Sequence, residues 1–147
     1  AAASSAALQA LCHPGLQAII VTPSNPWLSI APILSIDTIR STILNSSAPV
    51  VGVSPIIGGQ AVKGPTAKIM RELGIAPTAV AIAAHYAGLL DGLIIDVQDA
   101  KQRAAIEALG IEVRTGNTLM NTLNDKTRVA AQALEFASQL GRQGQHD

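Results

Sequence analysis

The chain has 147 residues, of which 48% are hydrophobic and 14% are charged, and its formal net charge is zero. This length fits one domain, residues 1–147, and the high apolar fraction excludes an intrinsically disordered chain. A neutral chain with 2% aromatic residues also lacks the basic field and the stacking platforms that generic nucleic-acid binding requires.

The charged residues are unevenly distributed. Residues 1–62 contain two charged side chains, Asp37 and Arg40, and the other 18 lie from Lys63 onward. The surface of a free-standing domain normally carries charge throughout. The uncharged first part therefore predicts buried strands, a covered face, or both.

The start of the chain predicts a segment of a longer cytoplasmic protein. It begins at Ala1 rather than Met, and it shows no signal-peptide pattern. The single cysteine, Cys12, cannot form an internal disulfide or a cysteine-based zinc site, so a reducing compartment is expected. No apolar run approaches the roughly 20 residues of a membrane span.

Short apolar runs bounded by turn residues predict strands, and Gly or Pro marks the ends of several helices. The strand at residues 18–22 is expected to be buried on both faces, and the helix at 78–90 is apolar nearly all round. The elements expected in chain order are a helix at 5–11, a strand at 18–22, a helix at 35–44, a strand at 49–53, helices at 66–73 and 78–90, a strand at 93–95 ending at Asp96, a helix capped by Asp99 and ending at Leu109, a strand at 111–114, and a helix at 124–140.

This alternation of strands and helices predicts an α/β fold, a Rossmann-like three-layer sandwich with a mostly parallel sheet. Ligands in such folds bind beyond the carboxyl ends of the strands. Two unusual loops, residues 23–32 and 54–65, follow expected strands and lie where chemistry is expected.

The second loop has the composition of a diphosphate cradle. Ser54 opens it, and Gly58 and Gly59 would let backbone N–H groups converge on an anion because they carry no Cβ. Lys63 adds a positive charge, but Gly64 follows it where a Walker A loop requires Ser or Thr. The alternative is a glycine-rich turn with a solvated lysine.

The first loop is stiffened by three prolines. Ser24, Asn25 and Ser29 could hydrogen-bond a ligand at the end of the first strand. The alternative is an Asx-type turn that satisfies its own backbone.

Other residues are weaker candidates. Asp96 ends a strand, where it could bind a ligand or cap a turn. Lys68 and Arg71 could extend a basic patch, but their helix also carries Glu72, which favours a solvated face. His85 and Tyr86 are expected to pack in the core or at an interface.

Together the two loops resemble those of the 2-phospho-L-lactate transferase (CofD) family. The resemblance extends from about residue 18 to 140. It is carried by Ser24-Asn25-Pro26, Ser29-Ile30, Pro32-Ile33-Leu34, Val53-Ser54-Pro55-Ile56-Ile57-Gly58-Gly59, Ala61-Val62-Lys63-Gly64-Pro65, Lys68-Ile69-Met70, Leu73-Gly74, Tyr86, Ile95-Asp96 and Thr118-Leu119-Met120.

The resemblance implies transfer of a phospholactyl or phosphoenolpyruvyl group from a guanosine diphosphate conjugate to the deazariboflavin precursor of coenzyme F420, with GMP released and Mg²⁺ required. It implies that the donor is bound by Ser24, Asn25, Ser29, Ser54, the Gly58–Gly59 pair, Lys63 and Gly64. Family members are about twice as long and open with a glycine-rich unit that has no counterpart here. No general base or metal ligand is assigned, and this chain is expected to be inactive alone and to self-associate.

Two alternatives are a nucleotide-sugar-binding regulator from the gluconeogenesis-factor branch of the same superfamily and a plain nucleotide-binding module. The intact Ser24-Asn25-Pro26 and Lys63-Gly64-Pro65 segments favour the transferase.

Overall fold

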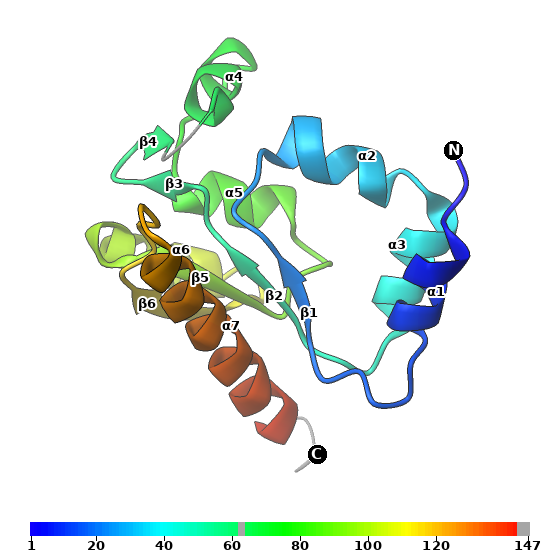
Figure 1. Cartoon of the computed structure of the whole chain (residues 1–147). Coiled ribbons are helices and arrows are strands. Elements are labelled where there is room, and N and C mark those ends of the chain that lie inside the picture. Colours follow the sequence, from blue (N-terminus) through cyan, green and yellow to red (C-terminus); the bar gives the residue numbers. More distant parts are fainter. Residues whose placement is uncertain (62–63, 144–147) are drawn as a thin grey trace.

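The computed structural model describes residues 1–61 and 64–143, and its strands form one parallel sheet and one small hairpin (Figure 1). The sheet has the spatial order β1 (Ile19–Val21), β2 (Val50–Val53), β5 (Gly92–Asp96) and β6 (Glu112–Gly116). The antiparallel hairpin consists of β3 (Ile56–Ile57) and β4 (Gln60–Ala61). The helices are α1 (Ser5–Leu11), the π-helix η1 (Pro26–Ile30), α2 (Ala31–Leu34), α3 (Asp37–Asn45), α4 (Thr66–Glu72), α5 (Ala79–His85), the 3-10 helix η2 (Val97–Gln102), α6 (Arg103–Glu107) and α7 (Leu123–Gln143).

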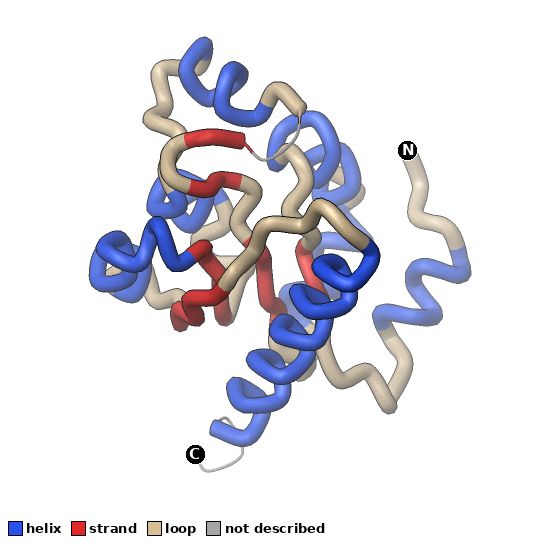
Figure 2. The backbone as a smooth tube through the Cα atoms, turned by 60° about the vertical axis from the view of Figure 1, so that its left-hand side comes forward, coloured by secondary structure: helices blue, strands red, loops and turns tan. Residues whose placement is uncertain are grey.

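The sheet is covered on both faces, which confirms the predicted Rossmann-like three-layer arrangement. Its spatial strand order equals the chain order. With the right-handed crossovers that parallel strands favour, this order brings the connecting helices back over the same face. Helices α3, α5 and α6 pack on that face in one apolar cluster with β2, β5 and β6. Helix α7 packs on the opposite face in a second cluster (Figures 1 and 2).

A glycine lets α7 approach the sheet closely. A Cβ on Gly92 would lie 2.6 Å from Phe136 Cε1 and 2.8 Å from Leu140 Cδ1, which is closer than carbon atoms approach without displacement. The aromatic ring therefore occupies the space that a side chain on β5 would fill.

The prediction that the first strand is buried on both faces is wrong. All three residues of β1 are only partly buried, because β1 lies at the edge of the sheet and pairs with β2 alone. The apolar run 18–22 specified a strand but not its position in the sheet.

Three other local predictions need correction. The segment expected to be a stiff loop at 23–32 is largely helical, since η1 begins at Pro26 and continues into α2. Helix α5 ends at His85, before Gly88, which adopts a φ of +83°. Asp99 does not cap a helix: Asp96 caps η2 through a hydrogen bond from Gln98 N–H, and Asp99 lies inside η2.

Within the described residues, no helix combines the length and apolar character needed to cross a membrane.

Candidate functional site

The two loops singled out in the sequence leave the sheet from neighbouring strands. Strands β1 and β2 pair in parallel, with Val21 opposite Gly52, so their carboxyl ends lie at the same edge. The segment 23–32 follows β1, and the β3–β4 hairpin follows β2. The edge predicted to bind a ligand is therefore assembled from both loops.

Asn25 organises the first loop. Its Oδ1 accepts hydrogen bonds from the N–H groups of Trp27 and Leu28, both at 2.9 Å, and so caps η1. This is the Asx-type arrangement left open as the alternative. Its Nδ2 is buried and has no hydrogen-bond partner, so the donor half of the amide is not used by the loop.

The three serines predicted to bind the donor differ in their surroundings. The Ser24 hydroxyl lies 3.0 Å from Thr22 Oγ1, and Ser29 is exposed. Ser54 is 1% exposed, and its hydroxyl bonds both the N–H and the C=O of Ile56 at 3.2 Å. Ser54 therefore shapes the turn into the hairpin, and the predicted ligand contacts of all three remain predictions.

A buried carboxylate fixes the Gly58–Gly59 turn of the hairpin. Gly58 has a φ of +55°, and its N–H donates to Asp99 Oδ1 and Oδ2 at 3.2 and 3.1 Å. Asp99 is 3% exposed and also accepts from Gln102 Nε2 at 3.2 Å. Gln102 Oε1 in turn accepts from Val80 N–H at 3.0 Å, which links the hairpin to α5. The Gly58 amide is thus already bound to an anion of the protein itself.

A positive charge reaches the same turn from α4. Arg71 Nη2 donates to the Gly59 carbonyl at 3.4 Å, whereas Lys68 on the same helix pairs with Glu72 at 3.8 Å. Gly64 is exposed and has a φ of +72°. Lys63 lies outside the described residues, so its predicted contact with the diphosphate stays a prediction.

A second buried carboxylate holds the loop that follows β6. Asp96 is 3% exposed, and its Oδ2 accepts from Thr118 N–H at 3.1 Å and from Thr118 Oγ1 at 3.3 Å. Its Oδ1 accepts from Gln98 N–H at 3.0 Å. Of the two roles left open for Asp96, the structure shows the capping role.

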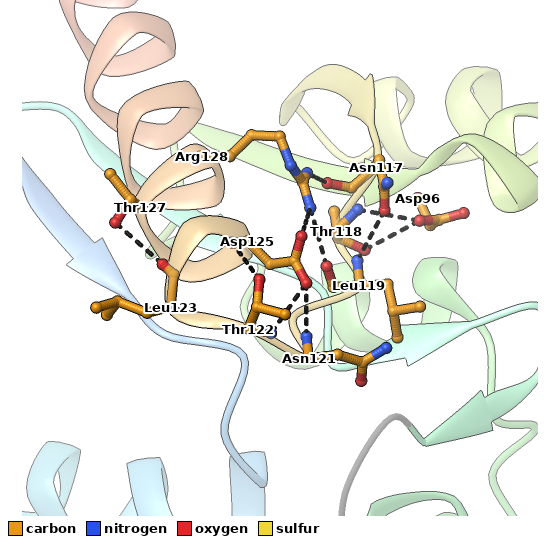
Figure 3. Close-up of polar contacts among 10 residues, drawn as sticks. All are labelled: Asp96, Asn117, Thr118, Leu119, Asn121, Thr122, Leu123, Asp125, Thr127 and Arg128. Carbon is orange, nitrogen blue, oxygen red and sulfur yellow. Dashed lines mark hydrogen bonds and ion pairs between the residues drawn. The ribbon is translucent and has the colours of Figure 1, made fainter.

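The other side of the 117–122 loop is held by the first turns of α7 (Figure 3). Arg128 donates to the carbonyls of Asn117 and Leu119, and its guanidinium pairs with Asp125 at 3.2 Å. Asp125 accepts from the N–H groups of Asn121 and Thr122 at 2.9 and 3.0 Å. The loop is therefore fixed through its backbone on both sides.

These contacts set the charge state of Asp125. The backbone N–H of Asn121, that of Thr122 and then the Arg128 guanidinium lower the pKa of the Asp125 carboxyl to about 2. It is ionised at any physiological pH.

A pocket of about 490 Å³ opens between the hairpin, η2 and the 117–122 loop. Figure 3 shows the side chains of Leu119 and Asn121 on the side of the loop away from α7. The residues that line it are Ile57, Gln60, Ala61, Asp96, Val97, Gln98, Asn117, Leu119 and Asn121.

His85 and Tyr86 lie outside this pocket. Tyr86 is 5% exposed within the core, as predicted, and burial raises the pKa of its hydroxyl to about 12. The His85 ring lies 4.9 Å from the Trp27 ring, and desolvation lowers its pKa.

Several residues of this edge were not identified from the sequence. Asn117 and Asn121 were not considered, a solvated face was favoured for Arg71, and Arg128 received no role. One signal was available: Asn117 and Thr118 directly follow the fourth strand, at a carboxyl end where polar residues commonly contact ligands.

The described residues contain no cluster of metal-ligating side chains. Nowhere in residues 1–61 and 64–143 do three or more His, Cys, Asp or Glu side chains gather to hold a metal ion. The buried carboxylates of Asp96 and Asp99 are engaged by N–H donors. Mg²⁺ stays a prediction of the resemblance.

Comparisons with known proteins agree on one family. The family model described as 2-phospho-L-lactate transferase CofD matches residues 1–136. A phosphoenolpyruvate transferase of Streptomyces griseus subsp. griseus is 41% identical over 123 residues, which are 83% of this chain and 39% of the relative. A 2-phospho-L-lactate transferase of Methanocaldococcus jannaschii is 38% identical over 122 residues, which are 83% of this chain and 38% of the relative. The chain thus spans about two fifths of the length of these curated relatives.

Replacing Asp99 should loosen the hairpin. In Asp99→Ala the Gly58 N–H and the Gln102 amide lose a buried acceptor, so we expect the free energy of unfolding to fall by about 1–3 kcal/mol. Hydrogen exchange at the Gly58 amide should accelerate more than exchange in β5. The exposed carboxylate of Glu112 provides the control, since Glu112→Ala should change stability by less than about 0.5 kcal/mol. Unchanged exchange at Gly58 would contradict the role of Asp99.

The low pKa of Asp125 predicts a pH dependence of stability. Because its folded pKa of about 2 lies below the ordinary value of 3.8, the ionised carboxylate stabilises the fold fully above that value, and this contribution is lost as the pH falls toward 2. Carboxyl ¹³C titration should place the midpoint near 2. In Asp125→Asn, the unfolding free energy should vary less over the same range. A midpoint near 4 in the folded protein would disprove the anchoring of the loop by this carboxylate.

Proposed function

The chain belongs to the 2-phospho-L-lactate transferase (CofD) family, and we propose that it binds the guanosine diphosphate conjugate that serves as donor in this family's reaction. The group transferred is phospholactyl or phosphoenolpyruvyl, the acceptor is the deazariboflavin precursor of coenzyme F420, and GMP is the leaving group. The named relatives support the transfer, since both kinds of transferase occur among them.

The observation that carries the proposal is the edge formed by the hairpin, η2 and the 117–122 loop. These three segments follow β2, β5 and β6 at the carboxyl side of a parallel sheet, where α/β folds bind nucleotides. A pocket opens there, and Arg71 donates to the Gly59 carbonyl in the turn of the hairpin. The buried carboxylates of Asp99 and Asp96 hold the walls in place, and Asp96 is also one of the residues that line the pocket.

The proposed reaction requires positioning more than covalent catalysis. The acceptor hydroxyl oxygen forms a bond to the phosphorus that carries the lactyl or enolpyruvyl group. The bond between this phosphorus and the bridging oxygen of the diphosphate breaks, and GMP leaves with that oxygen. The hydroxyl proton passes to a base that we do not assign. Catalysis of such a transfer depends on aligned reactants and on cations near the phosphate oxygens.

Within this scheme Arg71 binds the diphosphate. Its side chain reaches the Gly59 carbonyl at the Gly58–Gly59 turn, and a guanidinium can donate two hydrogen bonds to phosphate oxygens. Asn25 Nδ2 is the unused donor of the neighbouring loop and is proposed to contact the same ligand after a local adjustment.

The experiment that tests this function is a transfer assay with the full-length protein. It is supplied with the guanosine diphosphate conjugate of lactate or enolpyruvate, the deazariboflavin precursor and Mg²⁺, and GMP release is followed by chromatography. Stoichiometric GMP and phospho-ester product support the proposal. If the protein binds the donor but releases no GMP in the presence of the acceptor, the result would favour a nucleotide-binding regulator instead.

Arg71→Ala should weaken GDP binding about tenfold and slow transfer, as expected for loss of one charge-assisted hydrogen bond at an exposed position. Lys68→Ala is the matched control, because it removes a cation from the same helix that pairs with Glu72 rather than with the hairpin. Calorimetric titration with GDP measures both. Equal losses in the two variants would indicate a general effect of charge and would exclude a specific role for Arg71.

A further inference from the structure

A second pocket lies among the helices that cover one face of the sheet. It has a volume of about 280 Å³ and is formed by α2, the first turn of α3 and the segment that follows α5, and it is called the α2–α5 pocket below (Figure 1). It shares no described lining residue with the pocket between the hairpin, η2 and the 117–122 loop. The function proposed above therefore does not account for it.

Arg40 brings a positive charge to the α2–α5 pocket. It lies on α3 and is exposed. The ion pairs formed among the described residues do not include it, although Asp37 lies three residues earlier on the same helix. No Asp or Glu is among the described residues that line the pocket. An anion that enters meets a guanidinium there, which can bind a carboxylate through two N–H groups.

Tyr86 brings a buried hydroxyl that lacks a hydrogen-bond partner. Tyr86 lines the pocket and is 5% exposed, and within residues 1–61 and 64–143 nothing hydrogen-bonds its Oη. Burial raises the pKa of this hydroxyl to about 12, so it keeps its proton and is a donor at neutral pH. A buried donor that is left unsatisfied lowers stability, and such groups are rare in folded proteins. The partner that the hydroxyl lacks is an acceptor.

The rest of the lining carries no further charge at neutral pH. The Ser35 hydroxyl donates to the Pro32 carbonyl at 2.8 Å, so its proton is already used. Desolvation lowers the pKa of His85, and the neutral imidazole packs 4.9 Å from the Trp27 ring and 5.0 Å from the Tyr86 ring as part of the wall. The remaining lining residues are apolar, namely Ala31, Leu34, Ala87 and Leu89.

We propose that the α2–α5 pocket binds a small organic carboxylate, with Arg40 binding the carboxylate group and the Tyr86 hydroxyl donating to one of its oxygens. Both side chains are donors, so the ligand must supply acceptors, and a carboxylate supplies two oxygens. The apolar wall takes a short hydrocarbon portion, which inorganic phosphate lacks. The volume of about 280 Å³ lies below the roughly 300–1,000 Å³ of pockets for drug-sized ligands, so the ligand has few non-hydrogen atoms.

The test titrates the full-length protein with butyrate and with butyramide, which has a similar shape but no charge. Saturation-transfer NMR observes both ligands directly, and inorganic phosphate is added as a competitor. Butyrate should bind, butyramide should bind at least tenfold more weakly, and phosphate should compete poorly. These differences follow from loss of the charge in the amide and loss of the apolar portion in phosphate.

Two variants test the two donors. Arg40→Gln removes the charge at similar length, and we expect it to weaken butyrate binding about tenfold. Tyr86→Phe removes only the hydroxyl, and we expect it to weaken butyrate binding about three- to tenfold. Because that hydroxyl has no partner to lose, Tyr86→Phe should be as stable as the wild type without ligand. Lys126→Gln is the matched control, since it removes an exposed cation from α7 on the opposite face of the sheet.

The outcomes that would overturn the inference are distinct from those that concern the proposed function. Equal binding of butyrate and butyramide, equal losses in Arg40→Gln and Lys126→Gln, or no binding of butyrate to the wild type overturns the anion site. Phosphate that displaces butyrate at lower concentration than butyrate itself requires overturns the organic ligand. A less stable Tyr86→Phe with unchanged butyrate affinity overturns the role of the hydroxyl. GDP affinity, measured on the same samples by calorimetry, should be unchanged in both variants, and its loss in the wild type would overturn only the proposed function.

Discussion

Two buried carboxylates at the end of the inner strand β5 hold together the loops at the carboxyl edge of the sheet. Asp96 and Asp99 lie three residues apart at the start of η2, and each is 3% exposed. Asp99 binds the hairpin that follows β2, and Asp96 binds the loop that follows β6. Because β5 pairs with both of those strands, one short segment fixes the exits of its two neighbours.

In this arrangement the two carboxylates position the neighbouring loops through hydrogen bonds. A buried carboxylate is tolerated when N–H donors replace the water it loses, and here backbone amides supply them. The loops are ordered when the chain folds, so a ligand that binds between them does not have to order them again. Preorganisation of this kind matters most for a reaction that depends on alignment of a diphosphate with its acceptor.

The sequence predicts the alternation of elements well, because short apolar runs and glycine stops depend on local properties of the chain. Helix α1 begins and ends at the predicted residues, and Asp96 ends β5 as expected. The errors concern properties set by distant contacts. The run 18–22 is as apolar as a central strand, yet its position at the edge depends on pairing partners elsewhere. Asp99 has the features of a helix cap, and only the approach of Gly58, 41 residues earlier, gives it another role. The pocket has the same origin, since its walls come from three separate segments.

Helix α7 connects the packing of the sheet with the geometry of the pocket. Near its middle, Phe136 packs where Gly92 leaves room, which fixes the position of the helix on β5. In its first turns, Asp125 and Arg128 bind the backbone of the 117–122 loop. Asp96 holds that loop from the other side, also on β5. The 117–122 loop is therefore anchored to β5 in two ways, directly by Asp96 and indirectly through α7. A helix packed along its length moves as a unit. A change in the contact between Phe136 and Gly92 would therefore reach the pocket wall through Arg128. It would do so without altering any residue that lines the pocket.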